Sequence, residues 1–362
     1  MLRGLTRAEK LFALIGATLA VLAYLWVRLA MRMGPEATAQ RRLGLGLGGL
    51  LGRLWQWTPV PMAELVWIVG VLSAVGVTVG LTARRGGWGL LGACCRLILA
   101  AGVIYALFAV VFSVQYSAAP LSEQIGLDVG RYSAEQLYET AKRVTQELNE
   151  AAEQVARGGD GLFTPTLSFR EVCAACSASY RQGELKEIYA RGPGLYPKQA
   201  KLLSRATSYL SLAGYYFPIT GESVIGSDIM ETSVPFTVAH EMAHACGVGP
   251  EKEANFMAFV VCRDSSETDV RYSGLFNGYI YLNNALYAAD RDLWQSLYDG
   301  VSAPVKADLD AKTAHLQQFK GKVNDLGNKV NDAYIKTTGQ ADGVKSYGLV
   351  VDMIIAYYES MD

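Results

Sequence analysis

Residues 234–259 read VPFTVAHEMAHACGVGPEKEANFMAF, and this stretch decides how the C-terminal part of the chain folds. Pro235 suits the first turn of a helix, no helix breaker follows it directly, and Gly247 and Gly249 end the pattern. Pro250 then suits the start of a second helix with the sequence PEKEANFMAFVVC. The stretch therefore predicts two helices joined by a short glycine turn.

The first of these helices carries two histidines four positions apart. The whole chain has three histidines, and two of them are His240 and His244 in HEMAH. Residues i and i+4 lie on one face of a helix, so both imidazoles can reach one ion. Glu241 lies beside them, where it can take a proton from a metal-bound water. The spacing predicts a metal site in which Glu241 is the general base.

A catalytic zinc ion takes three protein ligands and keeps one position open, so a third ligand is needed. Glu251 and Glu253 are the nearest carboxylates in the second helix. We favour Glu251, because its helical face carries small residues that would let the two helices approach closely: Ala254, Asn255 and Ala258. In the alternative interpretation, one or both carboxylates only complement the helix dipole at an N-terminus.

HExxH followed by ExxAN, here residues 240–244 and 251–255, resembles the gluzincin class of zinc metallopeptidases. The resemblance implies a set of site residues: His240, His244 and Glu251 as ligands of Zn²⁺, and Glu241 as the general base. It also implies that Asn255 orients a ligand histidine and that a peptide or protein is the substrate. The spacing of seven positions from His244 to Glu251 is shorter than in most gluzincins, which keeps Glu253 open as the third ligand.

The wider pattern combines three N-terminal apolar stretches with PITGES, EANFMAF, RYSG and a terminal DGVKSYGLVVDMIIAYY. It is similar to a bacterial family of membrane proteins of unknown function with a metallopeptidase-like domain. Peptide hydrolysis also needs a donor for the oxyanion, and Tyr272 in RYSG is our candidate because a phenol can donate a hydrogen bond. The alternative is an ordinary core or interfacial tyrosine, since the chain has 20 tyrosines.

Three nearly charge-free apolar stretches predict membrane spans at about 11–31, 62–83 and 95–117. A helix rises ~1.5 Å per residue, so roughly 20 apolar residues cross the hydrocarbon core of a bilayer. The alternative for the first stretch is a secretory signal cleaved near Ala37-Thr38-Ala39. We therefore expect a membrane region over 1–122, with the lipid bilayer as a partner.

The segment between the first two spans, about 42–58, is rich in glycine and leucine and ends with Trp55 and Trp57. Aromatic residues beside arginines are typical of a segment that lies at the membrane interface. The alternative is a plain connecting loop.

Charge gives two further expectations. The net charge of −1 offers no electrostatic reason to expect a nucleic acid partner. The basic residues that flank the spans are nearly balanced between the two sides, but the stretch after the third span has Glu123 and Asp128 and no basic residue before Arg131. This favours a multi-pass protein of the cell membrane whose C-terminal domain lies outside the cytoplasm.

The C-terminal region, 123–362, is expected to be an α-rich, zincin-like domain with a short strand segment. Capping boxes at Ser133 and Ser168 open two helices, and the second contains Cys173 and Cys176, whose roles we expect to be structural or incidental. The remaining expected elements are a helix at 198–213, a strand segment at 215–229, and helices at 271–290, 305–336 and 344–360.

The sequence thus favours a membrane-anchored zinc metallopeptidase that hydrolyses peptide bonds. The alternative is a noncatalytic membrane protein whose metal site is structural or vestigial and which acts as a scaffold or binding module. An intramembrane protease is disfavoured, because Asp228, Glu231 and Lys252 lie close to the motif.

Overall fold

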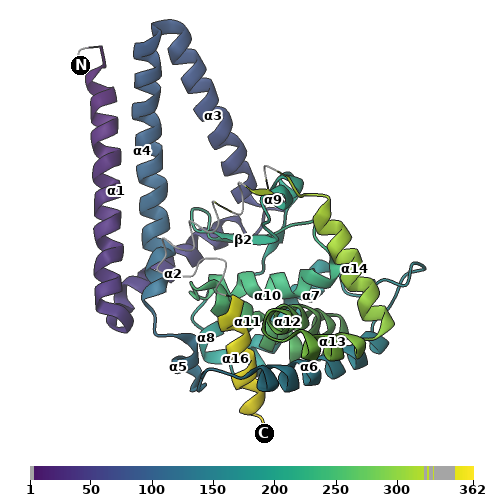
Figure 1. Ribbon diagram of the computed structural model, residues 1–362. Helices are drawn as coiled ribbons and strands as arrows, with labels where there is room; N and C mark the ends of the chain where they lie inside the picture. The colour runs from purple at the N-terminus through teal and green to yellow at the C-terminus, as the bar shows by residue number, and fades with distance from the viewer. Residues whose placement is uncertain (1–3, 322–323, 326–328, 330–346) are drawn as a thin grey trace. The chain divides into compact units, whose positions relative to one another are not determined.

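The computed structural model describes residues 4–321, 324–325, 329 and 347–362 (Figure 1). The chain is 72% helical with few strands. Internal contacts divide it into two compact units: unit 1 is Met1–Ala118 with Phe217–Glu222, and unit 2 is Ala119–Tyr216 with Ser223–Asp362. The predicted fold class is confirmed as mainly α, with three apolar N-terminal helices and a short strand segment.

Unit 1 contains three helices that are long and apolar enough to cross a membrane: α1 (Arg7–Met33), α3 (Met62–Arg85) and α4 (Gly87–Val111). The helix α4 begins at Gly87 and not near residue 95, and it ends before the short 3₁₀ helix η2 (Ser113–Ser117). Arg96 therefore lies inside this apolar helix, where a charge is costly unless it is compensated. Arg96 is accommodated because its guanidinium donates to Glu9 at 2.9 Å.

Glu9, near the start of α1, is fully buried and holds the same end of the three helices together. It accepts hydrogen bonds from Arg85 at 2.7 Å and from Arg96 at 2.9 Å, and it caps its own helix through the amide of Thr6 at 2.9 Å. A Cβ atom at Gly92 would lie 2.3 Å from its Oε1. A buried carboxylate needs such partners, so these interactions fix how α1, α3 and α4 pack.

The 3₁₀ helix η1 (Gly34–Glu36) and the helix α2 (Thr38–Trp55) connect α1 to α3. Unit 1 also includes the turn Phe217–Glu222, whose carboxylate at Glu222 accepts from the amides of Met62 at 3.1 Å and Ala63 at 2.8 Å. These amides have no partner inside the first turn of α3, so Glu222 caps that helix.

Unit 2 is built from helices: α5 (Leu121–Ile125), α6 (Ala134–Gln154), α7 (Phe169–Gln182), α8 (Lys186–Tyr189), α9 (Ser204–Tyr209), η3 (Glu231–Ser233), α10 (Val234–Ala245), α11 (Glu251–Arg263), α12 (Thr268–Ala289), α13 (Arg291–Asp299), α14 (Ala303–Gln317) and α16 (Tyr347–Glu359). The capping boxes predicted at Ser133 and Ser168 are present. Every residue of α11 from Glu253 to Cys262 is buried, so α11 lies at the centre of this unit, packed against α10, α12 and α16.

A small sheet accompanies these helices, with strands β1 (Lys198–Gln199), β2 (Gly214–Phe217) and β3 (Glu222–Ile225) in the order β1-β3-β2. It confirms the predicted strand segment. The helix predicted at 198–213 is wrong, because its first residues pair with β3 in parallel and only α9 is helical. The amide of Ala200 donates to the carbonyl of Ile225 at 2.8 Å, so tertiary pairing overrides local propensity there.

Of the two C-terminal helix predictions, the one at 344–360 is met from Tyr347 onward, whereas the one at 305–336 is too long, because the described residues 318–321 are not helical. The helix expected at 305–336 is α14, which ends at Gln317, and most of its predicted second half lies outside the described residues. The helix expected at 344–360 is described from Tyr347 onward as α16. Val350, Ile354 and Tyr358 are fully buried, as expected of a helix in the core.

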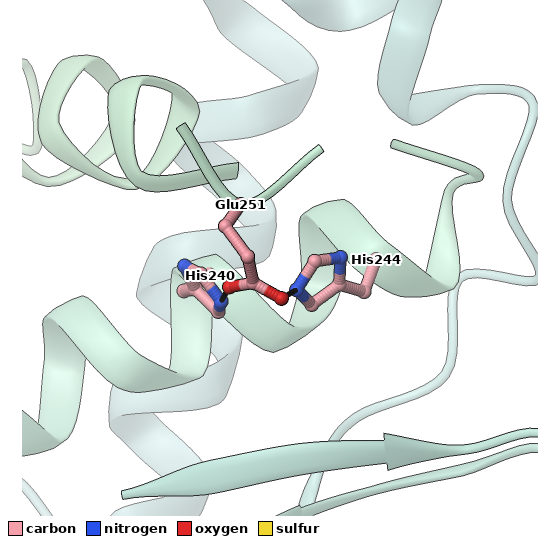
Figure 2. A group of neighbouring side chains, drawn as sticks. All are labelled: His240, His244 and Glu251. Carbon is pink, nitrogen blue, oxygen red and sulfur yellow. Dashed lines mark ion pairs between the residues drawn. The ribbon is translucent and has the colours of Figure 1, made fainter. Parts of the chain in front are cut away.

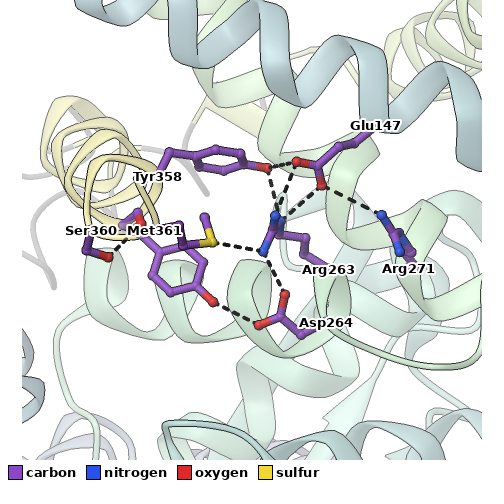
Figure 3. A network of polar contacts seen from close by, with 8 residues as sticks. Glu147, Arg263, Asp264, Arg271, Tyr358, Ser360 and Met361 are labelled. Atoms are coloured by element: carbon purple, nitrogen blue, oxygen red, sulfur yellow. Dashed lines mark hydrogen bonds and ion pairs between the residues drawn. The ribbon is translucent and has the colours of Figure 1, made fainter.

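A polar network at the C-terminal end of α11 ties three helices together (Figure 3). Arg263 donates from Nε to Glu147 of α6 and to the hydroxyl of Tyr358 of α16, at 3.1 Å in both cases. Its Nη1 donates to Asp264 at 2.9 Å. Because these charges pair with one another, the network fixes the C-terminal end of α11. It thereby also fixes the direction of the helix and so the placement of Glu251 at its other end.

Candidate metal centre

The two histidines of HEMAH lie on α10 and face one carboxylate (Figure 2). His240 Nε2 is 3.3 Å from Glu251 Oε2, and His244 Nε2 is 3.5 Å from Glu251 Oε1. The two imidazole rings are nearly perpendicular, with centroids 4.6 Å apart. Both histidines are largely buried and Glu251 is partly exposed, so the group opens toward solvent on the carboxylate side.

The two distances to Glu251 can be compared with the ligand spacing of a tetrahedral zinc ion. Ligand nitrogens and oxygens lie ~2.0–2.2 Å from zinc, and at a tetrahedral angle two such atoms are ~3.3–3.5 Å apart. The two nitrogen–oxygen distances of 3.3 and 3.5 Å match this spacing, whereas the limit of 4.8 Å within which the ligand atoms of all three residues lie is wider than it. Two imidazoles and one carboxylate are also a donor set that suits zinc.

The turn after α10 orients His244. Gly247 has a φ of 89°, in the left-handed region that favours glycine, and the amide of Val248 returns to the carbonyl of Ala243 at 3.1 Å. As a result the carbonyl of Val248 lies 2.7 Å from His244 Nδ1. A ring nitrogen beside a carbonyl oxygen must donate, which leaves Nε2 as the atom that can bind a metal.

His240 differs from His244 in that no described residue forms a hydrogen bond with its buried Nδ1. The resemblance to gluzincins implies that Asn255 orients a ligand histidine. Asn255 is buried on α11, but within the described part of the chain no hydrogen bond joins it to either imidazole, so that role stays a prediction.

The first two acidic residues of α11 point to different places. Glu251, the first residue of the helix, reaches both histidines, whereas Glu253 accepts a hydrogen bond from the amide of Leu121 at 3.2 Å. The geometry therefore brings Glu251 and not Glu253 into the cluster. The short turn makes this possible, because α11 starts only four residues after Gly247.

Charge in the cluster is shared among its members. Burial disfavours the charged form of His244, but the carboxylate of Glu251 outweighs this and raises the pKa of His244 to about 9. Burial likewise disfavours the charge on Glu251, yet the two imidazoles hold the pKa of Glu251 well below its usual range. The site is thus built to hold a positive charge next to Glu251, as a proton or as a metal ion.

Glu241 is buried beside the histidines, and burial raises its pKa to about 7. Its Oε2 has no hydrogen-bond partner among the described residues. Its other oxygen lies against the first residue of β2, where a Cβ atom on Gly214 would be 2.8 Å from Oε1. A carboxylate with a free, desolvated oxygen and a pKa near neutrality has the properties of a general base.

Other contacts hold α10 in place. Its Ala239 carbonyl accepts from the Tyr180 hydroxyl at 2.8 Å, and its Glu241 carbonyl accepts from Ser223 Oγ at 3.1 Å. Cys176 and Cys262 donate to the carbonyl of Pro235 at 3.7 and 3.6 Å. All six cysteines of the chain are free, and these two thiols act as buried helix contacts.

Tyr272 has different partners. It is fully buried on α12, donates its hydroxyl to Asp308 of α14 and lies 3.4 Å from Arg157 Nη2. Arg157 in turn is 3.1 Å from Asp308, and the ring of Tyr272 packs on Phe163 with centroids 5.3 Å apart. Its hydroxyl is therefore engaged with the buried Asp308–Arg157 ion pair and is not free to donate to an oxyanion.

Two contributors to the site escaped the sequence analysis. Gly214 is needed where β2 meets Glu241, and its only signal is a glycine before an aromatic strand. The carbonyl of Val248 orients His244, and a backbone carbonyl has no residue-specific signal. The turn glycine that positions it, Gly247, was visible in the sequence only as a helix stop.

Comparisons with known proteins identify the family and add no function. Neither the curated proteins nor the solved structures gave a match. One family does match, over residues 45–355, and it is described as "Protein of unknown function (DUF3810)". Since the match spans both the α2–α4 segment of unit 1 and nearly all of unit 2, the chain belongs to the DUF3810 family, whose function is unknown.

Proposed function

We propose that this chain is a membrane-anchored zinc metallopeptidase that hydrolyses peptide bonds. The observation that carries the proposal is the convergence of His240 and His244 on Glu251, at nitrogen–oxygen distances of 3.3 and 3.5 Å that suit ligands of a tetrahedral zinc ion. Within the described residues this group has three members. Three protein donors leave one position of a tetrahedral ion for solvent or substrate, as in catalytic zinc sites, whereas structural sites usually have four.

The chemistry follows from what each residue can do. A bound zinc ion would supply Lewis-acid activation of water and of the scissile carbonyl. His240, His244 and Glu251 would hold it. Glu241 would accept the proton of the attacking water at its free Oε2 and then return it to the leaving amine, which suits a carboxyl whose pKa burial raises to about 7.

The membrane region supplies the anchor and the setting. Three helices of membrane-spanning length precede unit 2. In the proposal all three cross the bilayer, which puts the N-terminus and unit 2 on opposite sides. The acidic stretch after α4, with Glu123 and Asp128 and no basic residue before Arg131, supports a location of unit 2 outside the cytoplasm. The substrate would then be a peptide or protein on that side of the cell membrane.

The test begins with metal content, measured by mass spectrometry on the full-length chain in detergent after zinc loading and desalting. We expect one zinc per chain in the wild type, its loss in His240→Ala, and a strong reduction in Glu251→Gln. Glu253→Gln is the matched control, because it changes a neighbouring carboxylate of the same helix that faces Leu121. Zinc retained in Glu251→Gln and lost in Glu253→Gln would reverse the assignment.

Hydrolysis is tested next with a quenched-fluorescent peptide library, using Glu241→Gln as the inactive control. This variant should bind zinc normally and cleave nothing, because only the proton acceptor is removed. A wild-type protein that binds one zinc per chain but cleaves no member of the library faster than Glu241→Gln would favour the noncatalytic alternative. A wild type that binds no zinc would remove the proposal altogether.

A further inference from the structure

Helix α2 (Thr38–Trp55) has three distinct sides, and each fits a different neighbour. It joins two membrane-length helices, α1 and α3, but it is not itself among the apolar spans. Successive residues of a helix are separated by about 100°, so its glycines, leucines and arginines can be assigned to sides. The three sides are about a third of a turn apart.

The glycine side packs against the rest of unit 1. Its members are buried: Gly44, Gly48 and Gly52. A Cβ atom at Gly44 would lie 2.5 Å from the carbonyl oxygen of Val110 and 2.8 Å from that of Val111, so the backbone of α2 touches the end of α4 directly. Arg41 reinforces this contact, since its guanidinium donates to the carbonyls of Pro35 at 2.7 Å and Ser117 at 3.3 Å.

The leucine side has no such cover. Its members recur at helical spacing and are exposed by 47%, 36%, 56% and 51%: Leu43, Leu47, Leu50 and Leu54. Trp57 follows the helix and is 78% exposed. Exposed leucines also occur on the last turns of α1, at Leu25 and Leu29. A protein surface that faces water does not normally carry such a row of large exposed apolar side chains.

The third side carries the exposed residues Arg42 and Arg53. An arginine fork suits the phosphate of a lipid headgroup. Interfacial helices typically combine an apolar side of Leu and Trp with a basic side.

We propose that α2 lies in the headgroup region of the leaflet where α1 ends and α3 begins, with its leucine side in the acyl chains. Arg42 and Arg53 lie at the level of the lipid phosphates, and the glycine side is the contact with α4. The bilayer is the occupant because both neighbours of α2 in the chain are membrane-length helices, which hold it at the bilayer surface. This inference is independent of any hydrolytic activity.

The experiment measures depth by electron paramagnetic resonance on the full-length chain in phosphatidylcholine and phosphatidylglycerol nanodiscs. Single cysteines carrying a nitroxide are placed at Leu47, Leu50, Arg42 and Arg53 in a Cys94→Ala background, since Cys94 is the exposed native thiol and the other five are buried. Collisions with oxygen, which concentrates in lipid, are compared with collisions with a water-soluble nickel chelate. Val71 in α3 and Leu316 in α14, exposed by 56% and 55%, serve as the lipid and water references.

We expect the oxygen-to-nickel ratio at Leu47 and Leu50 to approach that at Val71 and to exceed that at Leu316 by on the order of tenfold. The ratios at Arg42 and Arg53 should fall between the two references. Ratios at Leu47 and Leu50 equal to that at Leu316 would place α2 in water and overturn the proposal. Low collision rates with both reagents at Leu47 and Leu50 would also overturn it, because they would mean that protein, such as a second copy of the chain, covers the leucine side.

Discussion

Replacing Tyr272 by phenylalanine separates a structural tyrosine from a catalytic one. The substitution keeps the ring contact with Phe163 and removes only the hydroxyl that donates to Asp308, a carboxylate that is 1% exposed. Asp308 keeps Arg157 at 3.1 Å and the amide of Phe163 at 2.9 Å, so it retains these two donors and loses one. The loss of a hydrogen bond to a charged group costs about 1.5–3 kcal/mol of unfolding free energy.

For a unit of roughly 240 residues this corresponds to a fall in Tm of about 3–12 °C. The assay is thermal unfolding of the full-length chain in detergent, together with zinc content and peptide hydrolysis below the transition. Tyr279→Phe is the matched control, because it lies on the same helix and its hydroxyl contacts the neutral Asn283 at 3.0 Å, worth about 0.5–1.5 kcal/mol. An unchanged Tm in Tyr272→Phe with zinc retained and hydrolysis lost would refute this reasoning and restore the oxyanion role.

Three further outcomes are expected. Burial raises the pKa of Glu253 from 4.5 to about 7, so between these pH values the folded state binds more protons than the unfolded state, and its stability falls as the pH rises. Denaturant unfolding should show Glu253→Gln as stable as wild type near pH 4.5 and more stable by about 1–3 kcal/mol at pH 8. Equal stability of the two proteins at both pH values would contradict the burial argument. Removal of zinc with a chelator should lower the Tm of the wild type. Zinc at about a hundredfold its Kd should then restore about 2.7 kcal/mol of unfolding free energy in the wild type and none in His240→Ala. A stabilisation that His240→Ala shares would mean that zinc binds elsewhere. Gly214→Ala should leave the zinc content unchanged and reduce the rate of hydrolysis by on the order of a hundredfold. The reason is that the new Cβ would lie 2.8 Å from Glu241 Oε1 and 2.9 Å from Thr237 Cγ2. Full activity of this variant would show that Glu241 can move aside.

Local signals were sufficient for the helix pair that carries the site. Pro235, Gly247 and Pro250 are breakers and starters whose effect depends on their immediate neighbours, and the structure puts α10 and α11 where they indicate. The preference for Glu251 over Glu253 also followed from periodicity, since Glu251 shares its helical face with the small residues Ala254 and Ala258.

Long-range partners account for what the sequence could not reveal. The start of α4 at Gly87 places Arg96 inside the helix, and the charge on Arg96 is compensated by Glu9, which lies 87 positions earlier. The helix expected from Lys198 failed because that residue pairs with Val224 of β3. In both places a residue far away in the sequence determines the local structure. A single sequence does not show which distant residue that is.

The tight turn between α10 and α11 has a kinetic consequence. All three residues proposed to hold the metal lie within the twelve consecutive positions 240–251, so bringing them together closes only a very small loop and costs little chain entropy. Contacts of such low sequence separation form early. A zinc ion could therefore be captured by this helical hairpin while the C-terminal helix α16, nearly a hundred residues further on, is still being synthesised, and the ion would then serve as a nucleus around which unit 2 condenses.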